Sequence, residues 1–180
     1  LSCTEFSDKI IFCDTIKIKD GLWKYYYNGE LASEENYIDG VLNGLSKRYY
    51  INGQMSDEER FKSGEKIHWK FYYENGQLWG GGAIKDGEKI GVWSEYYENG
   101  ELREVANFKL GGEIDGLWKL YDEKGQLRVE YNILNGFYLG RIGWGENGEE
   151  IAWEEAEKWY HEEFNPPKCY DENGNRIECS

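Results

Sequence analysis

The sequence predicts an all-β fold: an elongated, single-layer antiparallel meander of repeated β-hairpins with a C-terminal capping helix. The first observation is a series of glycines separated by 24, 23, 24, 25 and 23 residues, namely Gly29, Gly53, Gly76, Gly100, Gly125 and Gly148. The second is the pattern around most of them, a Trp, two Tyr, Asn-Gly and then Leu or Met. Such a period indicates one supersecondary unit copied about five times.

Each Asn-Gly lies between runs of aromatic residues, which is the strongest short-range hairpin signal. We expect a two-residue turn there, with both residues at positive φ. A second glycine follows 11 residues after the first in five units, at Gly40, Gly64, Gly87, Gly111 and Gly136. Two turns per period imply two strands per period. On the outgoing strand, Leu or Met at +2 and an apolar residue at +8 from the turn Gly, such as Leu78 and Ile84, are expected to share a face because both offsets are even.

On the incoming strand, Trp and Tyr are three residues apart, as in Trp69 and Tyr72. An odd spacing places them on opposite faces of the pleat, and a lysine such as Lys70 accompanies the Tyr. We therefore expect one packed Trp face and one mixed Tyr/Lys face. Rows of aromatic side chains, each burying about 150–250 Å², would stabilise a sheet that has no second layer.

The unit G-x-W-x-x-Y-Y-x-N-G-x-L, with its second Gly, resembles the bacterial variant of the MORN repeat, which is sometimes labelled as an antitoxin. The resemblance covers residues 21–148 and implies a curved sheet of hairpins that serves as a binding scaffold. The chain departs from the pattern at Ser46 in place of Trp and at Ile67 in place of Gly. The first unit is one residue shorter between Trp23 and Asn28, and Ile142 stands where a sixth Trp is expected.

The two ends of the array look atypical, as repeat arrays require. Residues 1–20 are expected to form an N-terminal capping strand in which Ile10, Phe12, Ile16 and Ile18 alternate with polar residues. Residues 149–180 are expected to hold a capping helix over Glu149 to Phe164, followed by a final turn. The helix is predicted from an apolar stripe that ends before two prolines, formed by Trp153, Ala156, Tyr160 and Phe164.

The net charge of −14 is concentrated in the C-terminal tail. Residues 146–180 contain eleven acidic and three basic residues, a local charge of −8. Such a chain is repelled by nucleic-acid phosphates and anionic lipids, so no nucleic acid is expected as a partner. No apolar run approaches the length of a membrane span.

The cysteines lie outside the repeats, in two pairs that each span ten residues: Cys3 with Cys13, and Cys169 with Cys179. Two disulfides at the ends would suit an exported, periplasmic or cell-surface protein, while four free thiols would suit a cytoplasmic one. The start Leu1-Ser2-Cys3 is also compatible with lipid attachment to Cys3, which would exclude its disulfide.

No catalytic or cofactor-binding pattern is present. His68 and His161 are the only histidines, and neither lies in a spacing that brings two metal ligands together. The carboxylates are too numerous to nominate an acid and a base. We therefore expect no enzyme activity, no cofactor and no metal.

The leading hypothesis is a non-catalytic scaffold that binds another, unidentified protein through the Tyr/Lys face. That face is predicted to comprise Tyr26, Tyr49, Tyr72, Tyr96, Tyr121, Lys24, Lys47, Lys70 and Lys119.

Two alternatives remain open at this point. An antitoxin or immunity protein would occlude a basic toxin with an acidic tail, formed by Glu154, Glu155, Glu157, Glu162 and Glu163. A glycan-binding or cell-wall-binding protein would stack sugars, or cage choline, on its rows of aromatic side chains.

Overall fold

The computed structural model describes residues 2–6, 10–14, 18–164, 169–170 and 176–177, with side chains from 18 to 161. Its elements are β1 (Ser2–Phe6), β2 (Ile10–Asp14), β3 (Gly21–Tyr27), β4 (Glu30–Ile38), β5 (Val41–Tyr49), β6 (Met55–Lys62), β7 (Glu65–Tyr72), β8 (Leu78–Lys85), β9 (Glu88–Tyr96), β10 (Leu102–Phe108), β11 (Ile114–Tyr121), β12 (Leu127–Leu134), β13 (Phe137–Trp144), β14 (Glu150–Ile151), α1 (Trp153–Phe164), β15 (Cys169–Tyr170) and β16 (Arg176–Ile177).

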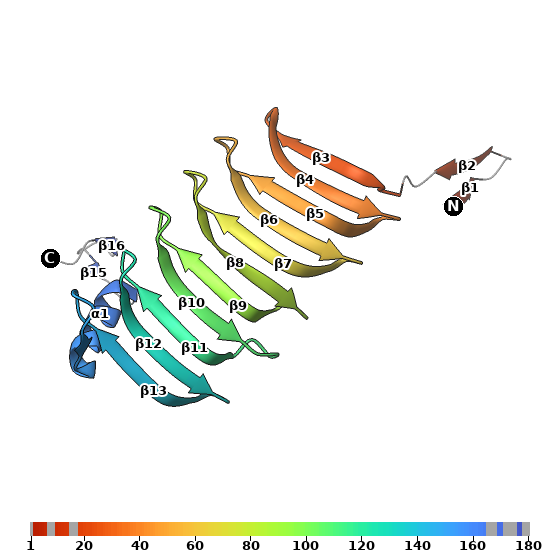
Figure 1. Ribbon diagram of the computed structural model, residues 1–180. Helices are drawn as coiled ribbons and strands as arrows, with labels where there is room; N and C mark the ends of the chain where they lie inside the picture. Colours follow the sequence, from red (N-terminus) through yellow and green to blue (C-terminus); the bar gives the residue numbers. More distant parts are fainter. Residues whose placement is uncertain (1, 7–9, 15–17, 165–168, 171–175, 178–180) are drawn as a thin grey trace.

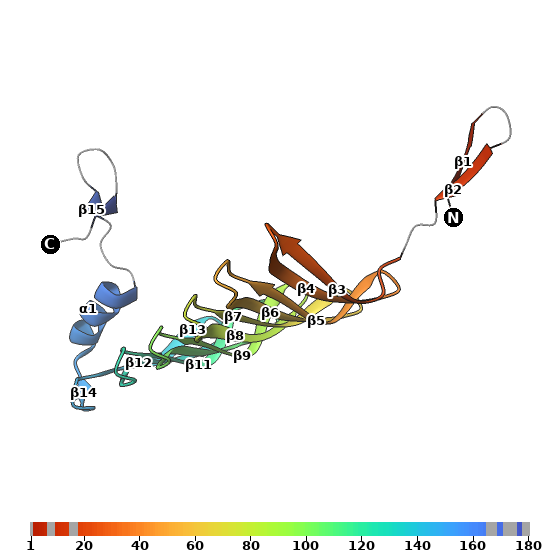
Figure 2. The same cartoon turned by 90° about the horizontal axis from the view of Figure 1, so that it is seen from above.

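Strands β3 to β14 form one 12-stranded sheet in which every strand pairs with its neighbours in sequence. All of these pairs are antiparallel. The sheet is open, long and curved, and α1 lies at its C-terminal end (Figures 1 and 2). The predicted single-layer meander with a C-terminal helix is therefore confirmed. The helix begins at Trp153, because Glu150 and Ile151 form the short strand β14.

The hairpin turns lie on two sides of the sheet, at opposite ends of the strands, and the two sets differ in type. The expectation of two-residue Asn-Gly turns is wrong at most positions. Asn28-Gly29 has positive φ at both residues, but at Asn52-Gly53 only the glycine does. There the amide of Gly53 donates to the carbonyl oxygen of Tyr50, and the amide of Tyr50 donates to that of Gln54. This is a longer turn that ends in a glycine bulge. Turns with two positive-φ residues lie mainly at the other end of the strands, at Asp39-Gly40, Ser63-Gly64, Asp86-Gly87 and Asn135-Gly136.

A second bulge, within β8, overturns the expected shared face of Leu78 and Ile84. Phe71 pairs with Gly80, but the next residue, Tyr72, pairs with Leu78. Because one extra residue is inserted in β8, Leu78 lies on the face of Tyr72 while Gly80 and Ile84 lie on the other face. The register shifts in the same way beside Leu31, Met55, Leu102 and Leu127.

Two ladders of side-chain hydrogen bonds join adjacent repeats on the side of the sheet where the turns around Gly53, Gly76 and Gly100 lie. In the first ladder a Tyr hydroxyl donates to a backbone carbonyl oxygen of the next repeat, at 2.7–2.8 Å: Tyr50 to Tyr72, Tyr73 to Tyr96 and Tyr97 to Tyr121. In the second an Asn side-chain amide donates similarly, at 2.8–3.2 Å: Asn52 to Glu74, Asn75 to Glu98 and Asn99 to Glu123. Both ladders end at the fifth unit, where Asp122 and Lys124 replace the Tyr and the Asn.

The C-terminal end contains a conventional core. Helix α1 packs on β12 and β13, and Ala156 is buried against Leu120, Val129, Tyr131 and Ile133. Gly143 allows the close approach, since a Cβ atom there would overlap that of Ala156. The helix therefore closes the last repeat on one face of the sheet.

Strands β1 and β2 form a separate two-stranded sheet, as do β15 and β16. The first pairing places Cys3 opposite Cys13 along the backbone. The second places Cys169 opposite Ile177, whereas Cys179 lies outside the described residues.

Candidate docking face

The pleat divides the side chains of the sheet into two faces, which we call the Tyr face and the Trp face. On the Tyr face, the tyrosine three residues after the Trp position of each unit pairs across the strands with a leucine or methionine. The pairs are Tyr26 with Leu31, Tyr49 with Met55, Tyr72 with Leu78, Tyr96 with Leu102 and Tyr121 with Leu127. The five predicted tyrosines therefore lie in one row on one face. Tyr26 is exposed and the others are half-buried beside these apolar side chains.

A row of alternating charges crosses the same face. By register it runs Lys24, Glu34, Lys47, Glu58 and Lys70 along successive strands. The ammonium of Lys24 lies 2.7 Å from a carboxylate oxygen of Glu34, and that of Lys70 lies 3.9 Å from Glu58. The predicted lysines are thus matched by carboxylates, and the face is not a basic patch.

The Lys24–Glu34 pair shifts the pKa of both partners. The hydrogen bond to Glu34 raises the pKa of Lys24, and the hydrogen bonds from Lys24 and from the Tyr49 hydroxyl lower the pKa of Glu34. At the other end of the row, Lys119 lies 2.9 Å from Glu130, which raises the pKa of Lys119. These shifts favour the charged forms of Lys24, Glu34 and Lys119.

The charge row is interrupted in the middle of the sheet. Between Lys70 and Lys119 the same row holds Gly81, Ser94 and Val105 on strands β8 to β10. Beside this uncharged stretch, Val92 and Leu117 are exposed on the same face. The result is a neutral, partly apolar surface that is bordered by charged residues and by tyrosines.

The Trp face differs because cations of the chain itself cover its aromatic rings. The ammonium of Lys19 lies 5.5, 5.0 and 4.6 Å from the ring centroids of Trp23, Tyr25 and Tyr37. Lysines also lie over Trp69 and Trp93, at 4.8 and 4.6 Å. Each of these contacts is a cation–π interaction. These five rings therefore already have a cation partner in the chain.

A buried carboxylate on the Trp face was missed in the sequence. Glu59 is only 3% exposed and pairs across the strands with Ser46, which replaces the Trp of its unit. Its carboxylate forms ion pairs with Lys66 and, at 3.1 Å, with Arg48. The missing indole at position 46 was the signal, because it leaves space that a polar cluster fills.

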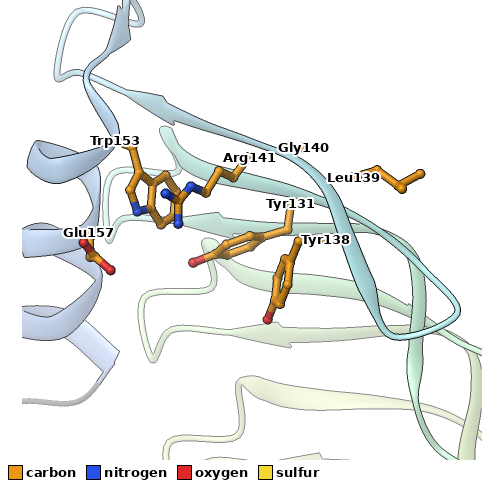
Figure 3. A pocket seen from close by; sticks show the side chains of 7 residues that line it. All are labelled: Tyr131, Tyr138, Leu139, Gly140, Arg141, Trp153 and Glu157. Atoms are coloured by element: carbon orange, nitrogen blue, oxygen red, sulfur yellow. The ribbon is translucent and has the colours of Figure 1, made fainter.

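At the C-terminal end the expectation about the sixth Trp position is also corrected. Arg141, rather than Ile142, pairs with Tyr131, which in turn pairs with Trp118. The Arg141 guanidinium lies 4.3 Å from the centroid of the Trp153 ring of α1. These side chains line a pocket with Tyr131, Tyr138 and Glu157 (Figure 3).

The predicted acidic tail is only partly described. Glu154, Glu155 and Glu157 are exposed on α1. The first two lie in its first turn, where carboxylates interact favourably with the helix dipole. Glu162 and Glu163 belong to α1, but their side chains lie outside the described residues. The structure therefore presents three carboxylates of the predicted acidic surface.

The histidines have ordinary surroundings. Burial and the nearby Lys70 lower the pKa of His68, and His161 contacts the ring of Tyr160. Within the described residues, no group of three His, Cys, Asp or Glu side chains is arranged to hold a metal ion. In the same part of the chain, no helix is long and apolar enough to cross a membrane.

The geometry defines the class of protein as an open sheet of stacked β-hairpin repeats. The model of the MORN repeat variant matches residues 19–39, 67–80, 89–110 and 114–135. The chain is therefore a MORN-repeat protein of this variant family. The unit that contains Ser46 lies between the matched segments, in keeping with its missing Trp.

A comparison with curated proteins gave no significant match. Among solved structures, the chain is similar to a chain of the "Crystal structure of GtfA/B complex bound to UDP and GlcNAc", at 16% sequence identity. The alignment covers 63% of this chain and 22% of that chain, with a TM-score of 0.27. A likeness at this level carries no inference about function.

Proposed function

We propose that this protein is a non-catalytic scaffold that binds another protein on its Tyr face. The repeat family supports a scaffold role in general. The observation that carries the proposal is the contrast in exposure between the faces. Val92 and Leu117 are exposed on the Tyr face, whereas Trp93 and Ala106 are buried on the Trp face.

The chemistry of the Tyr face fits a protein partner better than a polyanion. Its charges alternate from one strand to the next, and its centre is neutral between Lys70 and Lys119. Tyrosine is enriched in protein interfaces because its ring is apolar and its hydroxyl can donate or accept a hydrogen bond.

Site-specific photo-crosslinking in the native host tests this proposal. A benzoylphenylalanine is introduced in place of Tyr49, Tyr72 or Tyr96, and in place of Trp79 as an exposed control on the Trp face. We expect the three Tyr-face positions to yield an adduct with the same protein and the control to yield none. Equal adducts from both faces, or no adduct from the Tyr face, would contradict the proposal.

Export is a further part of the proposal, because the β1–β2 register brings the backbones of Cys3 and Cys13 opposite each other. Oxidation of all four cysteines would lower the intact mass by about 4 Da, since each disulfide removes two hydrogens. Mass spectrometry of protein from the native host checks this. Four free thiols would favour a cytoplasmic location.

A basic toxin is the second candidate partner, supported by the three exposed carboxylates of α1. Co-expression with a candidate toxin tests it. If the tail binds the toxin, replacing all five tail glutamates by glutamine should abolish protection of the host. Protection that survives the five substitutions would remove this role.

A further inference from the structure

Strand β13 leaves part of its outer edge unpaired. Strand β14 pairs only with Gly143 and Trp144. Among the described strands, none lies beside the outer edge from Phe137 to Ile142. The cause is local: β4 and β12 have nine and eight residues, whereas β14 ends after two and α1 begins at Trp153. No described strand therefore pairs with most of this edge, although Trp153 at the start of α1 contacts Arg141.

This edge has only part of the usual protection against pairing: it contains one bulge and one arginine, but no proline. Natural edge strands carry inward-pointing charges, prolines or strong bulges. Here Phe137, Tyr138 and Leu139 are 74%, 62% and 61% exposed, and the segment contains no acidic residue. Leu139 is the extra residue of a bulge that separates two stretches able to pair, Phe137 to Tyr138 and Gly140 to Ile142.

Arg141 gives the edge a chemical preference. It forms no ion pair with any described residue, and its guanidinium stacks on Trp153 at the wall of a pocket of about 490 Å³ (Figure 3). Stacking on the ring leaves the N–H groups at the rim of the guanidinium available to a carboxylate.

Earlier repeats show that a carboxylate can be accommodated opposite this position, although the third to fifth units have Gly82, Ala106 and Tyr131 there. The Trp-face residue of the following strand is a glutamate in the first two units, where Trp23 pairs with Glu35 and Ser46 pairs with Glu59. With arginine in place of tryptophan, a carboxylate opposite becomes more favourable, because opposite charges across a strand pair attract.

We propose that the free edge of β13 binds an extended segment of a partner protein by strand addition, with an acidic side chain facing Arg141. Side chains of the added strand on the Tyr face would be apolar, because they would lie beside Phe137 and Ile142. Backbone hydrogen bonds supply affinity in such complexes and alternate side chains supply specificity. This site is separate from the row of tyrosines, so an experiment can contradict one of the two proposals and leave the other standing.

The test uses the full chain and a capped hexapeptide of alternating valine and threonine with one central glutamate. We expect amides within 137–142 to exchange more slowly with solvent when the peptide is present. Arg141→Glu should lower the affinity for the peptide by about fivefold. A peptide with lysine in place of glutamate should bind the Arg141→Glu variant more tightly than it binds the original chain. Arg60→Glu, which alters an exposed arginine on the Tyr face of β6, is the matched control and should leave peptide affinity unchanged.

Two results would overturn the proposal. One is unchanged exchange over 137–142 at millimolar peptide. The other is a concentration-dependent dimer, measured by light scattering, in which the same amides are already protected without peptide. A second copy of the chain would then occupy the edge.

Discussion

On the Trp face of β9, Trp93 is 2% exposed although no helix or second sheet is described over it, whereas the adjacent Val92 on the Tyr face is 63% exposed. Side chains of the Trp face cover one another. Trp93 lies over Gly82 and under Lys89, a lysine also covers Trp69, and the buried Glu59 is paired with Lys66. A single-layer sheet can therefore assign stability to one face and leave the other available for binding.

The largest expected effect is loss of an indole from the Trp face. Trp93 covers Gly82 so closely that a Cβ atom there would lie 2.6 Å from the ring, and its Nε1 donates to the carbonyl oxygen of Ala83 at 2.8 Å. Trp93→Ala should lower the free energy of unfolding by about 3–5 kcal/mol. Val92→Ala should change it by less than about 1 kcal/mol. Denaturant unfolding measures both, and equal losses would contradict the distinction between the faces.

The second prediction concerns two glycines of β13 that lie on different faces. Gly143 faces Ala156 of α1, whereas a Cβ atom at Gly140 would meet nothing within 4 Å. Gly143→Ala should therefore cost about 1–3 kcal/mol through overpacking and detach α1. Gly140→Ala should leave the helix docked. Hydrogen exchange in α1 separates the two outcomes; protection of the helix in both variants would show that its docking does not depend on Gly143.

The third prediction compares the adjacent tyrosines of one repeat. The hydroxyl of Tyr73 donates to the carbonyl oxygen of Tyr96, and the ring of Tyr73 lies 5.7 Å from that of Trp79 on the Trp face. Tyr73→Phe should cost about 1 kcal/mol, because a part-buried carbonyl oxygen loses its donor. Tyr72→Phe should have almost no effect on unfolding. If both variants cost the same, the ladder does not join the repeats.

The smallest expected effect is a difference in pH dependence between two glutamates. Burial, and then Glu95 opposite it, raise the pKa of Glu104 on the Trp face, whereas Lys24 and Tyr49 lower that of Glu34 on the Tyr face. Stability linked to Glu104 is present below the unfolded pKa of 4.5 and is lost as pH rises through the folded pKa. Stability linked to Glu34 is present above 4.5 and is lost as pH falls through its folded pKa.

Glutamine substitutions should therefore act in opposite directions at pH 7. Glu104→Gln should stabilise the chain by about 0.5 kcal/mol, because like charges no longer face each other, and its oxygen can still accept from the Trp118 indole. Glu34→Gln should destabilise it. Unfolding measured from pH 3 to pH 8 checks both signs, and parallel curves for the two variants would refute the assignment.

The repeat period, the two strands per unit and the opposite faces of Trp and Tyr could be read from the sequence, because side-chain alternation in strands is strictly two-residue. The turn types could not be assigned from Asn-Gly alone, since this pair suits both a two-residue turn and a glycine bulge. The shorter first unit was the available signal: among the turns that contain the repeat glycines Gly29, Gly53, Gly76, Gly100, Gly125 and Gly148, only Asn28-Gly29 has positive φ at both residues.

The candidate site was predicted less completely. The row of five tyrosines follows from their spacing, but the carboxylate partners of the lysines depend on the register between strands. That register includes a bulge in each unit, so spacing alone could not match Lys24 with Glu34. The unpaired part of the β13 edge depends on where β14 gives way to α1, and helix boundaries are poorly determined by periodicity.

The most direct test of the central claim, that the Trp face holds the fold and the Tyr face is free, compares two leucines of β11. Leu120 is 0% exposed on the Trp face, and Leu117 is 48% exposed on the Tyr face. The free energy of unfolding should fall by about 2–5 kcal/mol in Leu120→Ala and by less than about 1 kcal/mol in Leu117→Ala. Similar losses in the two variants would mean that both faces are packed, and would contradict the account.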